Sequence, residues 1–428
     1  MSASPPRRAR VLWVTDEPPG LELGGGNIRQ AHLLQGLGRA ADVCLLVMGE
    51  VDNDVRDVVH DVVEVPARPL PQPGVKAVRR GLSLWLALAA SGPWEVALTT
   101  GRRRRLRRLV ERLAANTDLV VVSHLGLAGL LPGRRSVPWV LQLHHVSSAK
   151  AAQEQALIPG RRQRWLTTRE VAKARRFERW AVGAFDVVIT VSDEDAEALA
   201  GEAGETPPGR LVVVPNGVDT SRYPSAPLPD RPSVVMTGSL HYGPNVDGAQ
   251  WFVQQVFPRI REQVPDATLD LVGRAPPPEV RALAERPGVA VHGDVPSVAP
   301  WLERCRVAIV PLRIGTGTRL KALEAMAAGR PVVGTTLGLG GLGLVDGVQA
   351  RIVDDPVLMA DAVVELLRDD AQAAKLAHAG RALAEQRFEW SEIADAMAHQ
   401  LLAVLESSPS GTARANGDRS MVQEGRTE

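Results

Sequence analysis

One short stretch, GTGTRLKALEAMAAGRPVVGTT (residues 315–336), joins a glycine-threonine loop to a predicted helix over 318–328. Lys321 and Glu324 are three positions apart and therefore share one face of that helix. Backbone N–H groups of a glycine loop and a helix start bind anions, whereas a carboxylate accepts hydrogen bonds from hydroxyl groups. The stretch thus fits either a ligand that carries phosphate and hydroxyl groups, or an ordinary i,i+3 ion pair on a crossover helix.

Basic residues lie in and directly before this stretch. Arg313, Arg319 and Lys321 add positive charge beside the loop, which a phosphate group would require. A carboxylate at Glu324 suits such a site only where its partner is a neutral donor, and the hydroxyls of a ribose are donors of that kind. The charge pattern alone leaves the ligand site and the ion pair open as alternatives.

A second candidate lies near the amino terminus, where Gly24–Gly26 separate a predicted strand (10–16) from a predicted helix (27–39). Glycines at a helix start let backbone N–H groups approach an anion closely. The G-x-G-x-x-G spacing of dinucleotide sites is absent, so a flexible turn is an equal alternative.

His144 and His145 close a predicted strand over 139–145, at the carboxyl end where α/β proteins place their sites. Neighbouring strand residues point to opposite faces, so we expect only one imidazole to reach a ligand hydroxyl. A hydrogen-bonded structural role is the alternative for at least one of them.

Two further motifs favour structural explanations. Asp193 and Asp195 imitate a metal-binding D-x-D pair, but Ser192 before them is a natural N-cap and acidic residues suit a first helical turn. Asn216-Gly217 in VPNGVD is a turn signal. No metal site is therefore predicted.

The segment GRRRRLRRLVERL (101–113) carries its arginines around apolar positions at helix spacing. This pattern favours a solvated helix face. The alternative is a peripheral contact between Arg102–Arg112 and the inner face of the cell membrane.

Length and composition set the remaining bounds. The chain has 428 residues, enough for two domains, and its formal charge of +1 gives no global field for nucleic acid. Cys44 and Cys305 lie in or beside apolar strands and fit core positions. No signal peptide and no stretch long enough to span a bilayer is visible, so we expect a cytoplasmic protein.

Short β-branched runs alternate with amphipathic helical segments, the pattern of parallel sheets covered on both faces. The predicted strands form two series on either side of a proline-rich segment (220–232). The first comprises 10–16, 42–48, 118–124, 139–145, 186–192 and 210–218, and the second 233–240, 267–273, 289–295, 306–313, 330–336 and 350–355. Two consecutive doubly wound α/β domains are therefore predicted, with ligands at the carboxyl ends of the strands.

The segment PLRIGTGTRLKALEAMAAGRPVVGTT (311–336) closely resembles the donor-binding segment of glycosyltransferases of the GT-B fold, family 4 (the group 1 type). Other segments resemble the family in its own order: VPNGVD (214–219), GSLHYGPNVDGAQWFVQQVFPRI (238–260), LVGRAP (271–276), VHGDVPSVAPWL (291–302) and FEWSEIA (388–394). The Y-x-P-N and P-L-R-x-G-x-G wording is similar to a subgroup associated with exopolysaccharide or protein-sorting loci.

The resemblance implies two Rossmann-like domains facing each other across a cleft. The implied parts are an acceptor-side domain (1–219), a linker (220–232), a nucleotide-sugar-binding domain (233–390), a helix returning to the first domain (391–406) and a disordered tail (407–428).

The implied activity is that of a retaining, metal-independent hexosyltransferase of polysaccharide biosynthesis. It would move a sugar from a UDP-, GDP- or similar nucleotide sugar to a glycan, lipid or small-molecule acceptor, without a further cofactor. The leaving phosphate would assist deprotonation of the acceptor, so no protein nucleophile is expected. Two alternatives stay open: a non-catalytic nucleotide-sugar-binding protein, and a nucleotide-sugar epimerase on the same fold.

Glu324 matches the second glutamate of the family's E-x7-E motif and would bind ribose hydroxyls. His144 matches a histidine near the transferred sugar, and these two residues are the predicted catalytic pair. The other implied donor contacts are glycines, hydroxyl residues and basic residues: Gly25, Gly26, Gly238, Ser239, Arg313, Gly315, Thr316, Gly317, Thr318, Arg319 and Lys321.

Two departures from the family pattern affect the donor site. Thr316 stands where the first glutamate of the motif is expected, so recognition of the sugar would rely on backbone N–H groups and threonines. Ser239 and Pro244 occupy the region that usually carries an arginine and a lysine. We therefore expect Arg319 and Lys321 to neutralise the diphosphate instead.

Overall fold

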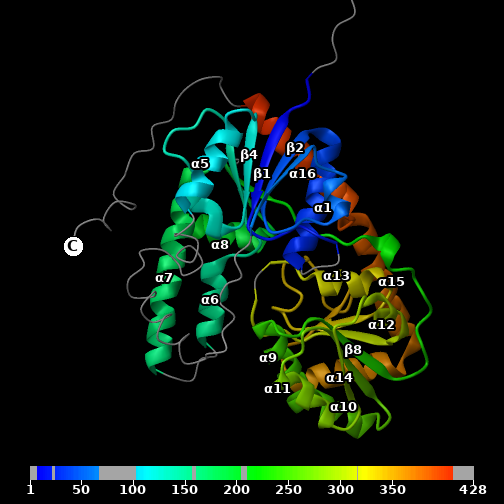
Figure 1. Cartoon of the computed structure of the whole chain (residues 1–428). Coiled ribbons are helices and arrows are strands. Elements are labelled where there is room, and N and C mark those ends of the chain that lie inside the picture. Colours follow the sequence, from blue (N-terminus) through cyan, green and yellow to red (C-terminus); the bar gives the residue numbers. More distant parts are fainter. Residues whose placement is uncertain are drawn as a thin grey trace, which may run out of the picture. The chain divides into compact units, whose positions relative to one another are not determined.

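The computed structural model of the chain describes residues 7–21, 25–66, 103–156, 161–203, 210–315 and 317–407. These residues form two compact units (Figure 1). The N-terminal unit comprises the residues up to Val214 together with those from Ala394 onward, and the C-terminal unit comprises Pro215–Ile393. Each unit is built around one parallel sheet, as the two series of strands predict.

The sheet of the N-terminal unit has, among the described residues, the strand order β3-β2-β1-β4-β5-β6-β7. The bounds are β1 Arg10–Thr15, β2 Asp42–Met48, β3 Asp61–Val65, β4 Leu119–Ser123, β5 Trp139–Gln142, β6 Val187–Thr190 and β7 Leu211–Val213. The first predicted series is confirmed. It lacks β3, because this strand pairs only with β2 and its exposed and half-buried residues give a weak hydrophobic signal.

Helices cover this sheet. They are α1 (Gly25–Ala40), α2 (Asn53–Arg56), α5 (Arg103–Ala114), α6 (Ser147–Ala156), α7 (Arg161–Ala184) and α8 (Asp193–Ala203), with a 3-10 turn at Leu125–Leu130. Leu106 and Val110 of α5 share one buried cluster with Leu12 and Val14 of β1. The apolar positions at helix spacing therefore face the sheet, as predicted.

The arginines of α5 whose side chains the structure describes line its outer faces. Arg105, Arg108 and Arg112 are exposed, and Arg107 Nε lies 3.0 Å from Glu111 Oε1. An exposed pair of this kind contributes at most about 1 kcal/mol, so the helix is held by its apolar face. Within the described parts of the chain, no helix is both long and apolar enough to cross a bilayer.

The capping prediction for α8 is confirmed. Ser192 Oγ accepts a hydrogen bond of 3.1 Å from the backbone N–H of Asp195, and α8 begins at Asp193. The acidic residues therefore occupy a first helical turn, where they interact favourably with the helix dipole. In the residues that the structure describes, no group of three His, Cys, Asp or Glu side chains could hold a metal ion.

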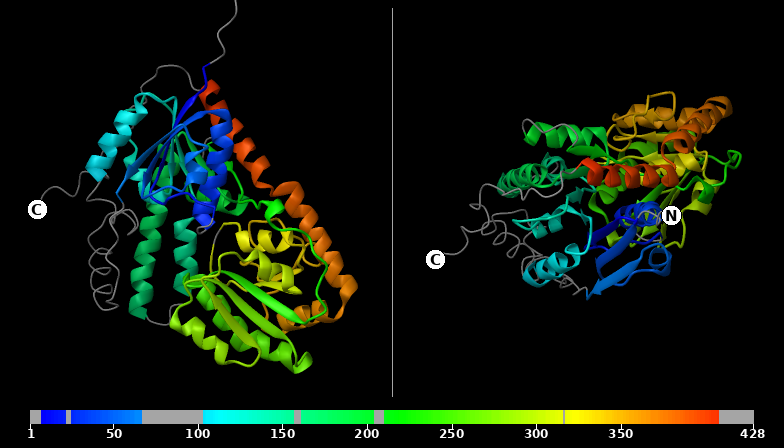
Figure 2. Two further views of the ribbon diagram at one scale, coloured as in Figure 1. Left: turned by 45° about the vertical axis from the view of Figure 1, so that its right-hand side comes forward. Right: turned by 90° about the horizontal axis from the view of Figure 1, so that it is seen from above.

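Helix α16 (Trp390–Ser407) belongs to the N-terminal unit from Ala394 onward (Figure 2). Gly36 of α1 packs directly against it, since a β-carbon at Gly36 would lie 2.6 Å from the backbone of Ala394. Arg39 Nη2 and Asp395 Oδ1 lie 2.7 Å apart beside this contact. The last described helix therefore completes the unit to which the first helix belongs.

The sheet of the C-terminal unit has the order β10-β9-β8-β11-β12-β13. Its strands are β8 Ser233–Ser239, β9 Thr268–Arg274, β10 Val289–Gly293, β11 Val307–Val310, β12 Val332–Gly334 and β13 Arg351–Ile352. The helices are α9 (Gly243–Trp251), α10 (Phe257–Gln263), α11 (Pro278–Arg281), α12 (Ala299–Arg304), α13 (Leu320–Ala327), α14 (Pro356–Arg368) and α15 (Asp370–Arg387). A π-helical turn, Phe252–Val256, joins α9 to α10. The second predicted series of strands is confirmed.

The proline-rich segment 220–232 is fixed to the C-terminal unit by two buried arginines. Arg330 donates to the carbonyl of Ala226 at 2.5 Å, and Arg306 donates to the carbonyl of Pro229 at 3.2 Å. A guanidinium carries five N–H donors and can satisfy carbonyls that no strand ladder reaches. The segment is therefore packed against this unit, and the division between the units falls at Val214, before it.

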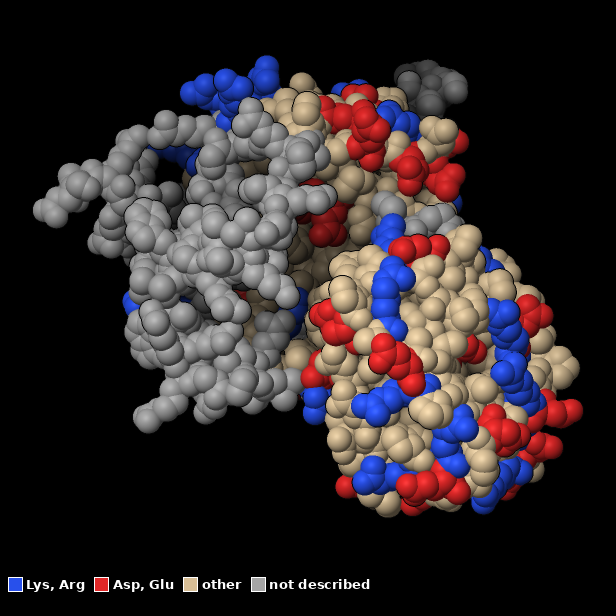
Figure 3. Space-filling view, turned by 60° about the horizontal axis from the view of Figure 1, so that its bottom comes forward, with Lys and Arg blue, Asp and Glu red and all other residues tan. Residues whose placement is uncertain are grey.

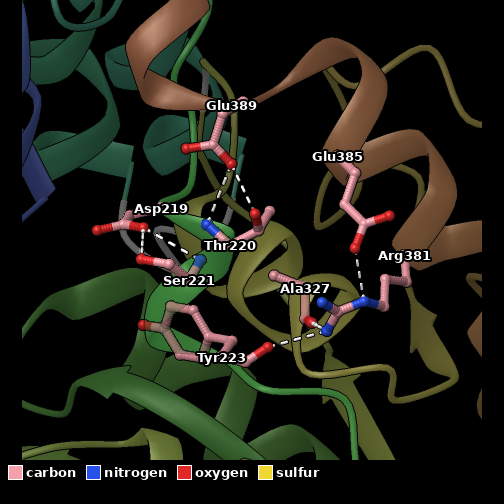
Figure 4. Close-up of polar contacts among 8 residues, drawn as sticks. All are labelled: Asp219, Thr220, Ser221, Tyr223, Ala327, Arg381, Glu385 and Glu389. Carbon is pink, nitrogen blue, oxygen red and sulfur yellow. Dashed lines mark hydrogen bonds and ion pairs between the residues drawn. The ribbon is translucent and has the colours of Figure 1, made fainter.

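The two ends of the C-terminal unit are tied to each other. Val218 donates its N–H to Phe388 O at 2.7 Å, and Trp390 donates to Val218 O at 3.1 Å. The carboxylate of Glu389 accepts hydrogen bonds from Thr220 N at 3.2 Å and Thr220 Oγ1 at 2.7 Å (Figure 4). The chain thus enters and leaves this unit at one hydrogen-bonded point.

Charges of both signs are mixed on the C-terminal unit. On the face shown in Figure 3, Lys and Arg side chains are interspersed with Asp and Glu side chains over the described residues. Arg381 Nε and Glu385 Oε1 of this unit form an ion pair at 2.7 Å (Figure 4). Neither sign of charge dominates this face. A positive potential at a binding site of this unit therefore depends on the basic side chains next to that site.

Candidate functional site

Each sheet has one point where the strand order reverses its direction. In the N-terminal unit this point lies between β1 and β4, and in the C-terminal unit between β8 and β11. Ligands of open α/β sheets bind outside the carboxyl ends of the strands at such points. Predicted site residues of both units lie at these two places, together with several residues that were not predicted.

At the end of β8, Gly238 leaves room for the side chain of Lys321. A β-carbon at Gly238 would lie 2.7 Å from Lys321 Nζ, and the backbone there has φ of +138°, which L side chains rarely adopt. Lys321 comes from the start of α13. Helix α13 therefore delivers its ammonium group to the end of the neighbouring strand.

Asn245 of α9 fixes that position. Its side chain is 5 % exposed, and its Oδ1 accepts a hydrogen bond of 2.7 Å from Lys321 Nζ. Its Nδ2 donates to Ser239 O at 2.8 Å. One buried amide thus joins α13 to the end of β8 and brings Gly238, Ser239 and Lys321 together.

The ionisation of Lys321 responds to this environment. Burial lowers the pKa of Lys321 to about 7; the nearby Arg319 lowers it further, and Glu324 opposes the shift. The ammonium form is therefore held only weakly around neutral pH. A phosphate group beside it would favour that form.

Glu324 lies on the same helix and is half-buried. Burial raises the pKa of its carboxyl, and this is opposed by a hydrogen bond from Tyr223 and by the positive charges of Lys321 and Arg222. The carboxylate therefore has a neutral hydroxyl donor beside it already. An interaction of this kind is what the ribose role requires.

The loop before α13 is held close to Arg319. Gly315 has φ of +137°, and a β-carbon there would lie 2.5 Å from Arg319 Nη2; Gly317 has φ of +77°. The helix begins at Leu320, two residues later than predicted, with Arg319 as its N-cap. Thr316, the position of the missing glutamate, lies outside the described residues.

Asn216 positions this loop from a distant part of the sequence. Its backbone N–H donates to Thr318 Oγ1 at 3.1 Å, and its Nδ2 donates to Thr318 O at 3.1 Å. The sequence indicated only a turn at Asn216, because a contact between residues 102 positions apart leaves no local signal. The structure adds a role in holding Thr318.

Arg313 is engaged elsewhere in the same unit. Its Nε and Nη2 lie 3.0 and 2.6 Å from the carboxylate oxygens of Asp247 on α9. A bidentate pair of this kind matches the guanidinium charge locally. The structure therefore pairs Arg313 with Asp247 and brings Lys321 into contact with Asn245.

In the N-terminal unit, two predicted residues from separate segments meet. A β-carbon at Gly26 would lie 2.8 Å from His144 Nδ1, and the other ring nitrogen of His144 lies 3.0 Å from Ser123 Oγ. The pKa of His144 is lowered well below its usual range, first by burial and then by the charges of Arg29 and its neighbouring histidines. His144 is consequently a neutral imidazole at the start of α1. Gly25 is the first residue of that helix, and Gly24 lies outside the described residues.

Strand β5 ends at Gln142, short of the predicted strand end at 145. The alternation of faces expected for His144 and His145 therefore does not apply. Their rings lie 6.0 and 6.3 Å from the ring of His124, so both approach the same neighbour.

Three residues at this sheet edge were not predicted as site residues. Asp16 and Glu17 follow β1, and His124 follows β4; His124 Nδ1 lies 3.8 Å from Asp16 Oδ2. Burial raises the pKa of both carboxyls, and His124 opposes the shift. The backbone of His124 has φ of +101°, a strained conformation that clusters at functional sites. Asp16 and His124 end predicted strands, but the sequence does not reveal that backbone conformation.

Comparison with known proteins gives this arrangement a family. The model described as Glycosyltransferase Family 4 matches residues 23–222, and the model described as Glycosyl transferases group 1 matches residues 231–369. The D-inositol 3-phosphate glycosyltransferase of Xylanimonas cellulosilytica is 32 % identical over 311 residues, which are 65 % of this chain and 70 % of that protein. The chain belongs to the family 4, group 1 glycosyltransferases.

Solved structures of this glycosyltransferase's fold agree with the two sheets. Sucrose-phosphate synthase from Thermosynechococcus elongatus superposes with a TM-score of 0.69 at 19 % identity, over 94 % of this chain and 100 % of that chain. Anabaena HepE in complex with UDP and glucose gives 0.64 at 16 % identity, over 92 % and 100 %. The fold is the GT-B arrangement of two Rossmann-like domains.

Proposed function

We propose that the protein is a retaining, metal-independent glycosyltransferase that uses a nucleotide-diphosphate sugar. The observation that carries this proposal is the apposition of Lys321 to Gly238 at the point where the C-terminal sheet reverses its strand order. A cation delivered there, beside a glycine loop, has the chemistry that a diphosphate needs.

Glu324 would bind the ribose of the donor. Its carboxylate already has Tyr223 as a hydroxyl partner, and it lies one helical turn from Lys321. A hydroxyl-bearing group next to a diphosphate would therefore meet an acceptor of hydrogen bonds next to a cation. UDP and glucose in the HepE structure support a nucleoside diphosphate of this kind, with UDP or GDP as the first candidates.

The charge of the leaving diphosphate would be stabilised by Lys321, Arg319 and the backbone N–H groups of Gly315, Gly317 and Thr318. Preorganised donors of this kind stabilise charge that develops in the transition state. The leaving phosphate would accept the proton of the acceptor hydroxyl, which is the same-face course implied for the family. No covalent bond from a protein nucleophile to the sugar is needed.

The acceptor would be a glycan, lipid or small molecule with a free hydroxyl near the N-terminal sheet edge. Asp16 and Glu17 carry carboxylates there, and His124 and neutral His144 carry imidazoles. Carboxylates accept hydrogen bonds from hydroxyls and repel phosphates. This edge accordingly favours an acceptor whose reacting part is uncharged.

Thermal unfolding with a panel of UDP-, GDP- and ADP-sugars tests the donor, because a ligand that binds only the folded chain raises its melting temperature. Transfer is then measured from the stabilising donor to glycan and lipid acceptors, with and without EDTA. We expect stabilisation by one nucleotide and transfer that EDTA leaves intact. Stabilisation without turnover would indicate a non-catalytic binding protein, and a new nucleotide sugar formed without acceptor would indicate an epimerase.

A further inference from the structure

We propose that Asn245 is a positioning residue that holds Lys321 over the end of β8, so that binding of a nucleoside diphosphate draws one proton from solvent onto this lysine. This inference rests on the proposed function, because it concerns the same donor site. It adds a role for Asn245, the asparagine of the Y-x-P-N motif, to which the sequence assigned no role, and a property, proton uptake, that the donor site would have.

The geometry leaves Asn245 one orientation. Its backbone N–H donates to Tyr242 O at 2.8 Å, and its side-chain Nδ2 donates to Ser239 O at 2.8 Å. An amide nitrogen cannot face an ammonium group favourably, so the bond to Ser239 O directs Oδ1 at Lys321 Nζ. The asparagine is therefore locked by its backbone and by β8, and Lys321 is locked by the asparagine.

The partner of Lys321 is also uncharged. A carboxylate at residue 245 would hold the lysine as an ammonium ion at every ordinary pH, whereas an amide oxygen accepts from either the amine or the ammonium form. The neutral partner thus leaves the charge of Lys321 to be set by its other neighbours and by the ligand.

Charged neighbours of Lys321 come from its own helix. Arg319 disfavours the ammonium form and Glu324 favours it. From α9 the lysine meets Asn245, and from β8 it meets Gly238. Burial outweighs the attraction of Glu324 and brings the pKa of Lys321 to about 7. In the free protein this site therefore loses most of its ammonium charge between about pH 6 and 8.

A bound diphosphate changes that balance. Its negative oxygens near Lys321 Nζ favour the ammonium form, so the pKa of the lysine rises on binding. By linkage, affinity is greatest below the pKa of the free lysine. It weakens by about tenfold per pH unit above that value, until the pKa of the bound state is reached. The net change is the transfer of one proton from the buffer to the amine of Lys321.

Isothermal titration of UDP and of GDP into the whole chain, at pH 6 to 9.5 and in two buffers of different ionisation enthalpy, measures this uptake directly. We expect close to one proton to be taken up near pH 8 and little near pH 6. Lys321→Arg keeps a cation that cannot lose its proton, and should bind with an affinity nearly independent of pH.

Asn245→Asp is the decisive variant. Its carboxylate should hold Lys321 as an ammonium ion. The onset, meaning the pH at which nucleotide affinity begins to weaken, should therefore rise by at least one unit, and proton uptake at pH 8 should fall. Gln250→Glu, which introduces the same charge five residues further along α9, should keep the onset of the wild-type chain. Asn245→Leu removes the acceptor of the ammonium form, so the pKa of free Lys321 should fall and nucleotide affinity should begin to weaken at a lower pH than in the wild-type chain. Melting temperatures without ligand establish that each variant is folded.

The outcomes separate the inference from the function on which it rests. If neither UDP nor GDP binds the wild-type chain, and no ADP-sugar of the thermal panel stabilises it, the proposed donor site is wrong. If either nucleotide binds without proton uptake, Lys321 is not the titrating group and the inference is overturned. If folded Asn245→Asp weakens binding equally at all pH values and the onset stays in place, Asn245 has only a structural role.

Discussion

The two sheet edges of this protein have the same topology and different chemistry. Where β8 meets β11, helix α13 brings Lys321 to the carboxyl end of β8, and Glu324 lies one turn later on the same helix. Where β1 meets β4, they carry Asp16, Glu17 and a histidine. Topology therefore selects the place of a site, and the few residues after each strand select its ligand.

The backbone at the carboxyl ends of the strands also differs between the two sheets. At β8, Gly238 takes a backbone conformation that glycine adopts without strain, and so admits another residue's side chain. After β4, His124 takes a positive φ although it has a side chain, at a cost of about 1–3 kcal/mol. The first edge makes room for a protein cation, whereas the second keeps an imidazole in a strained position that packing must maintain.

Gly238→Ala should cause the largest loss of nucleotide affinity at the donor site of the C-terminal unit. The new methyl group would displace Lys321 Nζ and place alanine at φ of +138°. Loss of a charged hydrogen bond contributes about 1.5–3 kcal/mol, so we expect nucleotide affinity to fall by about 10- to 100-fold. Gly243→Ala is the matched control, because a β-carbon there meets nothing within 4 Å. Titration calorimetry measures both, and equal affinities would contradict the position assigned to Lys321.

Glu324→Ala should separate binding of the ribose from binding of the diphosphate. Removing the carboxylate leaves ribose hydroxyls without an acceptor, which weakens UDP or GDP binding by about 1–3 kcal/mol. Pyrophosphate, which has no ribose, should lose less affinity, because Glu324 affects its binding only by favouring the ammonium form of Lys321. Competition of each ligand against a fluorescent nucleotide measures the difference, and parallel losses for the two ligands would remove Glu324 from the ribose.

Asn216→Ala tests whether the loop before α13 needs its remote support. Two hydrogen bonds to Thr318 are lost, each contributing about 0.5–1.5 kcal/mol. We expect an increase in the KM for the donor of several-fold, with acceptor KM unchanged. Steady-state kinetics with each substrate varied in turn decides this, and an effect confined to the acceptor would contradict it.

Asp16→Asn tests the N-terminal sheet, and its expected effect on thermal stability is the smallest of these variants. Burial raises the pKa of Asp16, so ionisation at neutral pH opposes folding, and this cost disappears as pH falls through the folded and then the unfolded pKa. The variant should melt slightly above the wild-type chain at pH 7 and equally near pH 3.5. Transfer to acceptor should fall although nucleotide affinity is unchanged.

Melting curves at the two pH values, together with calorimetric titration of UDP, check the Asp16 prediction. Asp193→Asn, which changes the same charge at the first turn of α8, is the matched control. A loss of nucleotide affinity in Asp16→Asn would show that the two edges do not have separate ligands.

The sequence predicts much of the fold because buried parallel strands are nearly continuous apolar runs. Both strand series are therefore found, whereas the edge strand β3, half-exposed and paired on one side, is not. The site is predicted where its residues lie in one segment, as Lys321 and Glu324 do. The bond between Asn245 and Lys321 joins residues 76 positions apart, and the strain at His124 is a backbone angle. Neither long-range contacts nor single dihedral angles leave a periodic pattern.

The contact of Gly36 with Ala394 also sets an order of events during biosynthesis. Ala394, Met397, Ala398 and Leu401 are buried and belong to the N-terminal unit, although they are made after the whole of the C-terminal unit. A nascent chain can therefore complete its C-terminal unit while the earlier unit still lacks a helix. The first half of the polypeptide is finished second, and it must keep an apolar surface available beside α1 until α16 has left the ribosome.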